Sequence, residues 1–313
     1  MNKHHLLLLG TYPAVDMEIL EREYQLHKLW EQKDPAAYLK NHAVEIRALA
    51  TRGDLGVKKD VLELLPNLKV IANYGVGVDA IDFEACQAQG IKVCNTPDVL
   101  TEDVADLALA LMLGIARHIA QADAYTRAGK WPAATYPLHT RMNTKRLGIL
   151  GLGRIGMAIA KRAEGFSMPI AYYTRQPRYK AGYQYYGSPE ELARNSDFLV
   201  AIVPGGAGTQ NLVNAKVLKA LGSSGYFINV SRGSVVDEPA LLDALENKVI
   251  AGAGLDVYWN EPNINPRYLK LDNVVLHPHG GSATVETRAA MGKLVRDNLT
   301  AFFSGKPLLT PVN

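Results

Sequence analysis

Three residues in the second half of the chain, Arg232, Glu261 and His279, are of types that act together in acid–base chemistry on a carboxylic acid. A guanidinium offers two parallel hydrogen-bond donors to a carboxylate. A histidine titrates near neutral pH and can donate a proton, and a neighbouring carboxylate raises its pKa by favouring the imidazolium form. Each residue alone is more often a surface charge or a satisfied polar group. Together, near predicted strand ends, they fit a site that holds a keto acid and protonates a developing alkoxide.

A glycine-rich segment precedes these residues. Its pattern, Gly151-x-Gly153-x-x-Gly156, stands between a predicted strand at Leu147–Leu150 and a predicted helix at Met157–Phe166. The first glycine permits a tight turn, the second lets the backbone approach a pyrophosphate, and the third lets helix and strand pack closely. A helix N-terminus also offers N–H groups to an anion. A purely structural turn is the alternative, but the context favours a dinucleotide site at Gly151, Leu152, Gly153, Arg154, Ile155 and Gly156.

The residues after the second strand of this region bear on the choice of dinucleotide. In sites that prefer NAD, an acidic residue about 20 positions after the loop bonds the ribose hydroxyls. Here the predicted strand Ile170–Tyr173 is followed by Thr174, Arg175 and Arg178, and by no Asp or Glu. A guanidinium pairs with the 2′-phosphate of NADP, which a carboxylate repels. The sequence therefore favours NADP(H), with NAD(H) as the alternative if both arginines are solvated turn residues.

Strand-like and helix-like segments alternate along most of the chain, a pattern that predicts parallel sheets covered by helices on both faces. We expect an α/β protein with two doubly wound parallel-sheet domains. A long apolar helix is expected at Glu102–Gly129, buried in part by another subunit, with Thr101 as its N-cap and a loop after it at Trp131–Arg146. The other expected strands are His5–Leu9, Val44–Thr51, Leu68–Tyr74, Ile91–Cys94, Phe198–Val203, Tyr226–Asn229, Ala251–Asp256 and Asn273–Leu276, and the other expected helices are Asp16–Trp30, Lys58–Leu65, Asp82–Gln89 and Thr284–Phe303.

The composition is that of a globular protein, with 48% apolar residues, 21% charged residues and a net charge of +3. No window is long and apolar enough to cross a bilayer, and the leucine run after His5 is too short for a signal peptide. Lys and Arg form no stripe of the kind that binds nucleic acid. Two cysteines, Cys86 and Cys94, cannot form a disulfide framework and are expected to be reduced thiols in a cytoplasmic protein.

The histidines show no metal-binding pattern in the sequence. His277-x-His279 has the spacing of half a metal site, but no third ligand stands at a suitable spacing. His4, His5 and His118 have no partner pattern, so solvated or structural roles are expected for them. The sequence therefore predicts no metal.

With these motifs in place, the sequence resembles the D-isomer-specific 2-hydroxyacid dehydrogenase family. The matching segments follow the family's order and spacing from about residue 74 to about residue 298: the glycine loop, Asn229–Asp237, Gly254–Val257 followed by Glu261-Pro262, and Pro278-His279. The resemblance implies that Arg232 binds substrate, that His279 is the acid–base group and that Glu261 bonds to that histidine.

The resemblance also implies a wider set of binding residues. Asp256 corresponds to an aspartate near the nicotinamide carboxamide, and the backbone of Val76 and Gly77 to a loop that holds the substrate carboxylate. Where the family often has a Pro-Leu-Thr turn, this chain has a glycine-rich segment that ends in Thr209. The expected substrate contacts are Val76, Gly77, Leu100, Arg232 and His279, and the expected cofactor contacts are Thr101, residues 151–156, Thr174, Arg175, Arg178, Val203, Pro204, Thr209, Val230, Arg232, Asp256, His279 and Gly281.

Within the family, Asn95–Thr101 and Tyr173–Gln176 are similar to the glyoxylate/hydroxypyruvate and hydroxyphenylpyruvate reductases. This implies NADPH-dependent reduction of glyoxylate, hydroxypyruvate or an arylpyruvate to the D-2-hydroxy acid. The alternatives are another member such as a phosphoglycerate dehydrogenase, and a dinucleotide-sensing regulatory protein without catalysis.

The family's architecture is implied as well. Residues 1–97 and 284–313 are expected to form a flavodoxin-like substrate domain, into which a Rossmann cofactor domain of residues 98–283 is inserted. A homodimer is expected. Trp131 and Tyr136 either line a substrate pocket, in a region that can reach a neighbouring subunit's site, or are surface aromatic residues.

Overall fold

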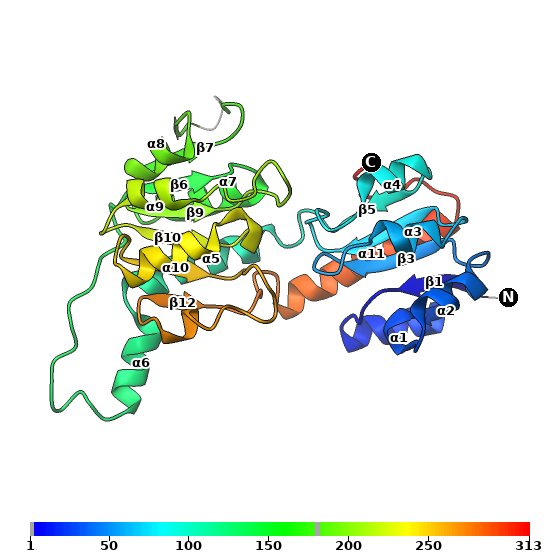
Figure 1. The fold of residues 1–313 in the computed structure, drawn as a ribbon, viewed down its shortest axis with the longest axis horizontal. Coiled ribbons are helices and arrows are strands. Elements are labelled where there is room, and N and C mark those ends of the chain that lie inside the picture. Colours follow the sequence, from blue (N-terminus) through cyan, green and yellow to red (C-terminus); the bar gives the residue numbers. More distant parts are fainter. Residues whose placement is uncertain (1–2, 179–181) are drawn as a thin grey trace. The chain divides into compact units, whose positions relative to one another are not determined.

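The computed structural model describes residues 3–178 and 182–313, and these form two compact units. The first unit consists of residues 1–100 and 282–313, and the second of residues 101–281. Each unit contains one parallel sheet with helices on both faces (Figure 1). The predicted α/β class with two parallel sheets is therefore confirmed.

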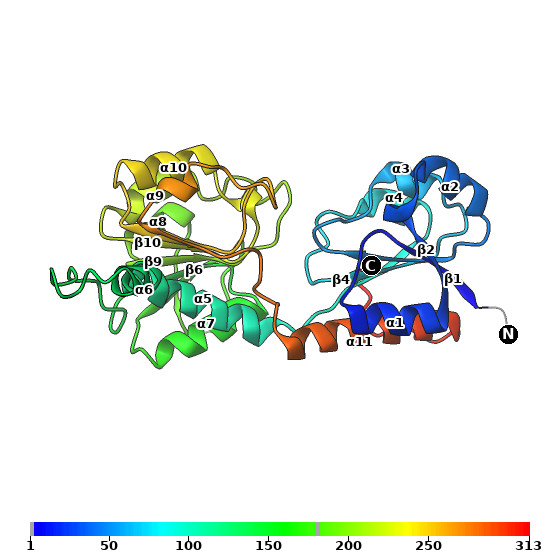
Figure 2. The same ribbon diagram turned by 90° about the horizontal axis from the view of Figure 1, so that it is seen from below.

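The first unit has a five-stranded sheet in the order β2-β1-β3-β4-β5, which is the flavodoxin-like order. Figure 2 shows helices α1 and α11 on one face of this sheet and α2, α3 and α4 on the other. Central strands are buried on both faces, as the fully buried run Leu6–Leu8 illustrates. The strands are β1 (His4–Leu8), β2 (Tyr24–Lys28), β3 (Ala48–Arg52), β4 (Val70–Tyr74) and β5 (Lys92–Cys94), and the helices are α1 (Ala14–Glu23), α2 (Pro35–His42), α3 (Lys59–Glu63), α4 (Phe83–Ala88) and α11 (Val285–Phe303).

The second unit has a seven-stranded sheet in the order β12-β11-β10-β9-β6-β7-β8. Counted from β6, the first six strands follow the Rossmann order 3-2-1-4-5-6, with β12 added at one edge. Helices α5 and α7 lie on one face, and α8, α9 and α10 on the other (Figure 2). The strands are β6 (Leu147–Leu150), β7 (Ile170–Tyr173), β8 (Gln184–Tyr185), β9 (Phe198–Ala201), β10 (Tyr226–Asn229), β11 (Gly252–Leu255) and β12 (Val274–Leu276), and the helices are α5 (Thr101–Ala116), α6 (Ile119–Arg127), α7 (Arg154–Glu164), α8 (Pro189–Arg194), α9 (Ala215–Leu221) and α10 (Glu238–Glu246).

The predicted helix at Asp16–Trp30 is wrong in its second half. Helix α1 ends at Glu23, where the N–H of Tyr24 caps it by bonding the carbonyl of Leu20. The chain then forms the edge strand β2, which pairs in parallel register with β1. Apolar residues at helical spacing continue past Tyr24, but the hydrogen bonds available from β1 outweigh that local pattern.

The single long helix predicted at Glu102–Gly129 is also wrong. It is divided into α5 and α6, and α5 begins at Thr101 itself, so Thr101 is its first helical residue and not its N-cap. The break is at His118, which has a left-handed backbone with φ of 50°. The ring of His118 stacks on that of His139, with centroids 4.6 Å apart, and this contact ties the break to the following loop. Residues 131–146 contain no helix or strand, as expected.

Helix α7 begins at Arg154, three residues before the predicted start, because it grows directly from the glycine loop. Helices α2, α8, α9 and α10 and strand β8 were not anticipated. Within residues 3–178 and 182–313, no helix combines the length and the apolar character that a membrane span requires.

Candidate active site

The glycine loop lies at the point where the strand order of the second sheet reverses, between β6 and β9. Gly151 has φ of +101°, and a Cβ there would lie 2.4 Å from the carbonyl oxygen of Ile202, the residue after β9. A Cβ on Gly156 would lie 2.2 Å from the carbonyl oxygen of Gly151. Both positions therefore exclude a side chain. Gly151 lets the turn pack closely against the sheet, and Gly156 lets helix α7 pack closely against the turn.

Gly153 differs from the other two glycines of the loop. A Cβ added to it would meet no heavy atom within 4 Å, so its backbone borders open space at the N-terminus of α7. The first helical bond of α7 runs from the N–H of Met157 to the carbonyl of Gly153, and the N–H groups before Met157 have no acceptor within the helix. The combination of an open backbone and a positive helix end fits a dinucleotide pyrophosphate.

The residues after β7 present cations and no carboxylate. Arg175 and Arg178 are exposed, and the backbone N–H of Arg178 donates to the hydroxyl of Tyr172 at 2.7 Å. The hydroxyl of Thr174 donates to the carbonyl of Gln176 at 2.6 Å, which closes a small turn. These contacts order the backbone on both sides of Arg175, so the turn can present guanidinium groups to a phosphate.

The segment after β9 forms a loop that is closed by Thr209. The hydroxyl of Thr209 donates to the carbonyl oxygens of Pro204 at 2.6 Å and Gly206 at 3.2 Å. Its proton is therefore used inside the loop, and only its lone pairs remain for a ligand. Cofactor contacts at Thr209, Val203, Pro204 and the buried Val230 remain predictions.

A histidine–carboxylate pair lies at the end of the same sheet. The Nδ1 of His279 is 2.5 Å from Oε2 of Glu261. The other carboxylate oxygen of Glu261 accepts from the backbone N–H of Tyr258 at 2.8 Å, which fixes its orientation. The hydrogen bond and charge of Glu261 raise the pKa of His279, while burial opposes the rise. An ionised carboxylate only accepts, so His279 donates from Nδ1 and presents Nε2 elsewhere.

Asp256 organises the turn that carries His279. Its carboxylate is buried and accepts from the N–H groups of Gly280 at 2.7 Å and Gly281 at 3.0 Å. It also lies 2.6 Å from Nδ1 of His277. The N–H of His279 donates to the carbonyl of Asp256 at 2.8 Å, which supports the left-handed backbone of His279, at φ of 49°.

Arg232 lies on the loop after β10. The side-chain oxygen of Asn229 accepts from the N–H and hydroxyl of Ser231, and its amide donates to the carbonyl of Arg232 at 3.0 Å. A Cβ on Gly233 would lie 2.0 Å from the carbonyl of Tyr258, so the loop packs directly against the segment that precedes Glu261. The charge of Arg232 is close enough to His279 to oppose the rise in the pKa of that imidazole.

The predicted catalytic residues of the second unit are thus brought together by three loops at one sheet edge. The supporting contacts of Asp256, His277 and Asn229 were not foreseen. The H-x-H spacing draws attention to His277. Its partner Asp256 follows a different strand, and no local sequence pattern indicates that the two residues interact. Asp256 remains a predicted contact of the nicotinamide, and its carboxylate now also has a structural explanation.

The predicted substrate loop belongs to the first unit. The carbonyl of Gly75 accepts from the N–H of Thr96 and from the amide of Asn73, and the carbonyl of Val76 accepts from the amide of Asn95 at 2.9 Å. In a trans peptide the N–H points opposite to the carbonyl. These bonds therefore turn the N–H groups of Val76 and Gly77 away from the supporting side chains, as carboxylate binding requires. Leu100 is buried in the same unit.

Comparison with known proteins was consistent with this geometry. Residues 109–281 match the family described as D-isomer specific 2-hydroxyacid dehydrogenase, NAD binding domain. The chain is 46% identical over 293 residues to a hydroxyphenylpyruvate reductase of Plectranthus scutellarioides, covering 94% of each chain, and 45% identical over 311 residues to a 2-ketogluconate reductase of Gluconobacter oxydans, covering 99% of each. It also resembles the crystal structure of an NADPH-dependent glyoxylate/hydroxypyruvate reductase from Sinorhizobium meliloti in complex with NADP and malonate, with a TM-score of 0.93 and 43% identity over 99% of this chain and 97% of that one. The chain therefore belongs to the D-isomer specific 2-hydroxyacid dehydrogenase family.

Proposed function

We propose that this protein reduces a small 2-keto acid to the D-2-hydroxy acid with NADPH as the preferred hydride donor. Its family makes it an NAD(P)-dependent oxidoreductase of 2-hydroxy and 2-keto acids. The observation that carries the proposal is the 2.5 Å contact between His279 and Glu261 beside the charge of Arg232. That arrangement supplies a proton donor and an anion-binding group at the carboxyl ends of the strands of one sheet.

Each residue has one task in the proposed reaction. Glu261 keeps His279 protonated, and His279 donates the proton on Nε2 to the oxygen of the keto group as it gains negative charge. Arg232 pairs with the substrate carboxylate. The backbone N–H groups of Val76 and Gly77 remain predicted substrate contacts of the first unit. When bound, the reduced dinucleotide supplies the hydride to the keto carbon.

The proposed dinucleotide contacts form two groups, which bind different parts of NADPH. Residues 151–156 hold the pyrophosphate, and Thr174, Arg175 and Arg178 meet the 2′-phosphate of NADPH. The exposed guanidinium groups and the absence of a carboxylate in the described residues directly after β7 support NADPH. The Sinorhizobium meliloti relative, which is NADPH-dependent by its title, also supports it.

The substrate proposal is glyoxylate, hydroxypyruvate or an arylpyruvate. Relatives named glyoxylate/hydroxypyruvate reductase and hydroxyphenylpyruvate reductase support it. The Gluconobacter oxydans relative, named 2-ketogluconate reductase, adds a larger 2-keto acid to those worth testing.

The first prediction concerns substrate and cofactor. The purified chain should oxidise NADPH, seen as loss of its absorbance, when one of these four keto acids is added, with kcat/KM higher for NADPH than for NADH. Replacing Arg175 by alanine should lower kcat/KM for NADPH by about 10-fold or more and leave NADH little changed, because a charged hydrogen bond to phosphate is lost. The exposed Arg194, at the end of α8, gives a matched control, R194A. No turnover with any of the four, or a clear preference for NADH, would contradict the proposal.

The second prediction concerns pH. The pKa of His279 is raised above 6.5 by Glu261, and reduction needs the imidazolium form, so kcat/KM should fall as pH rises through that raised pKa. Glu261→Gln keeps a hydrogen-bond acceptor but removes the charge. The falling limb of the pH profile should then move to lower pH, with near-normal rates at the acid end. A limb that stays in place would show that Glu261 does not control His279.

We further propose that the protein is a homodimer in the cytoplasm. Ile119 on α6 and Trp131 and Leu138 in the loop after it are exposed apolar side chains. They support a surface in this region that a second copy of the chain covers. Cys86 and Cys94 are free and buried, and burial raises the pKa of both thiols, so neither readily forms a thiolate. Unpaired thiols are typical of proteins in a reducing compartment, which supports the cytoplasm.

A further inference from the structure

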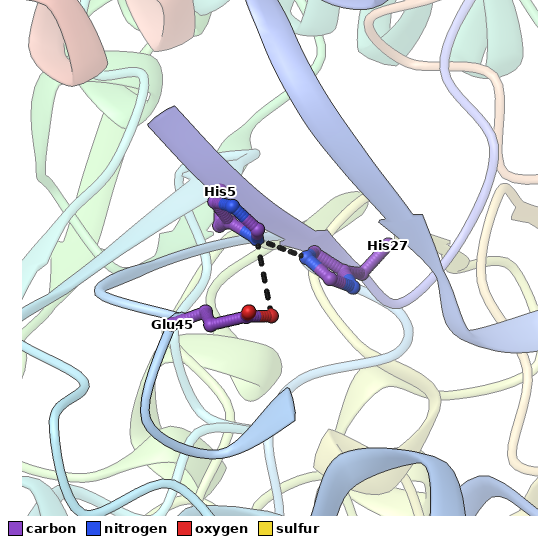
Figure 3. A group of neighbouring side chains, drawn as sticks. All are labelled: His5, His27 and Glu45. Carbon is purple, nitrogen blue, oxygen red and sulfur yellow. Dashed lines mark hydrogen bonds and ion pairs between the residues drawn. The ribbon is translucent and has the colours of Figure 1, made fainter. Parts of the chain in front are cut away.

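A second cluster of titratable side chains lies in the first unit and shares no residue with the site described above. It consists of His5 on β1, His27 on the edge strand β2, and Glu45 in the turn between α2 and β3. In the parallel register of β1 and β2, Leu7 lies opposite His27 and His5 opposite Gln25. Side chains alternate between the faces of a sheet, so His5 and His27 project from the same face. Figure 3 shows the two imidazoles and the carboxylate converging.

The donor atoms of this cluster have the separations of metal ligands. Nδ1 of His5 is 2.9 Å from Nε2 of His27 and 3.5 Å from Oε2 of Glu45. All three atoms lie within 4.8 Å of one another. Tetrahedral Zn²⁺ with bonds of about 2.0 to 2.2 Å places its ligands roughly 3.4 Å apart. Only small rotations of the side chains would therefore admit an ion between them.

Further side chains orient these donors from outside. The second ring nitrogen of His27, Nδ1, is 2.8 Å from the hydroxyl of Tyr38 on α2. Nδ1 of His42, at the end of α2, is 2.9 Å from Oε2 of Glu45. A hydrogen bond to the non-ligating nitrogen of a histidine fixes its tautomer and ring orientation, as in most metal sites.

The donors differ in burial. The side chain of His27 is buried, whereas those of His5 and Glu45 are 32% and 49% exposed, so an ion could reach the donor atoms from the solvent side.

We propose that His5, His27 and Glu45 bind a divalent transition-metal ion, with Zn²⁺ the best match to two imidazole nitrogens and one carboxylate oxygen. Mg²⁺ and Ca²⁺ are excluded by this donor set because they prefer oxygen ligands. The fourth position is left for water, with His42 beside the site. The ion would join β1, the edge strand β2 and the turn after α2, and would therefore stabilise the first unit.

The test uses the full chain after treatment with EDTA and dialysis. Titration with ZnCl₂ in a calorimeter should show one saturable site per chain and a matching rise in Tm. His5→Gln and Glu45→Gln, which alter partly exposed side chains, should each weaken that binding by about 10-fold or more. His4→Gln, one residue away on β1 with its ring stacked on Phe303, is the matched control and should bind as the wild type does.

Two further measurements keep the result decisive. Co²⁺ in place of Zn²⁺ should give a visible absorption band that is lost in His5→Gln. His279→Gln should keep the calorimetric site, which separates it from binding at the catalytic pair. Absence of saturable binding, or equal affinity in the wild type, His5→Gln and Glu45→Gln, would overturn the proposal and leave a hydrogen-bonded cluster that only joins the strands. Unchanged reductase activity in His5→Gln and Glu45→Gln would show that these two variants fold.

Discussion

Replacing His279 by alanine is expected to lower kcat for keto acid reduction by about 10² to 10⁴-fold, the usual contribution of a positioned general acid. This corresponds to about 3 to 5 kcal/mol of transition-state stabilisation. The 2.5 Å bond to Glu261 uses Nδ1 of His279, so Nε2 is the group that donates a proton to the substrate. The alanine variant lacks this donor. Binding of NADPH should remain, because the contacts proposed for it at residues 151–156 are made by backbone groups. Steady-state kinetics and a fluorescence titration with NADPH measure the two effects separately.

His277→Ala is the matched control for this prediction. His277 lies two residues away and bonds Asp256, but Asp256 keeps its bonds to the N–H groups of Gly280 and Gly281 when the imidazole is removed. The turn should therefore survive, and the loss of kcat should be much smaller than in His279→Ala. Wild-type kcat in His279→Ala would contradict the acid role. A parallel loss of NADPH affinity would instead indicate that the turn had collapsed.

The sequence predicts the glycine loop and most strands of the second unit well because their signals are local. Each buried parallel strand is a short apolar run, and the glycine loop follows directly after one such strand. Arg232, Glu261 and His279 each follow a strand end, and parallel strands bring their carboxyl ends to one edge. The order of the segments along the chain was therefore enough to predict that these three residues meet.

Two of the errors fall where contacts between distant parts of the sequence are present. Tyr24–Lys28 has a pattern compatible with a helix, and only its pairing with β1 makes it a strand. At the break, the ring of His118 stacks on that of His139, 21 residues further on. Asp256 binds the turn after β12 from the end of β11, and nothing near Asp256 in the sequence indicates that partner.

The cluster of His5, His27 and Glu45 also depends on contacts between residues that are distant in the sequence, so it could not be predicted. No local spacing links the three residues, so His5 alone gave no reason to expect a ligand. The error at β2 hid the cluster further, because a helix at Asp16–Trp30 would remove the register that places His27 beside His5.

Replacing Arg232 by alanine is expected to lower kcat/KM for the keto acid by about 10² to 10⁴-fold, since two hydrogen bonds to a carboxylate are lost. The loop itself should persist, because the side chain of Asn229 holds the backbone of Arg232 and Gly233 still fits against Tyr258. Arg232→Lys keeps the charge without the planar pair of donors, so it should lose about 10 to 100-fold.

The pH profiles of these two variants separate charge from geometry. The charge of Arg232 opposes protonation of His279, so its removal in Arg232→Ala should raise the pKa of that imidazole and move the falling limb of kcat/KM to higher pH. This shift is opposite in sign to that expected for Glu261→Gln. Arg232→Lys should leave the limb near its wild-type position while kcat/KM is reduced throughout. An unchanged kcat/KM in Arg232→Ala would exclude Arg232 from substrate binding, and a limb that moves to lower pH would show that its charge does not act on His279.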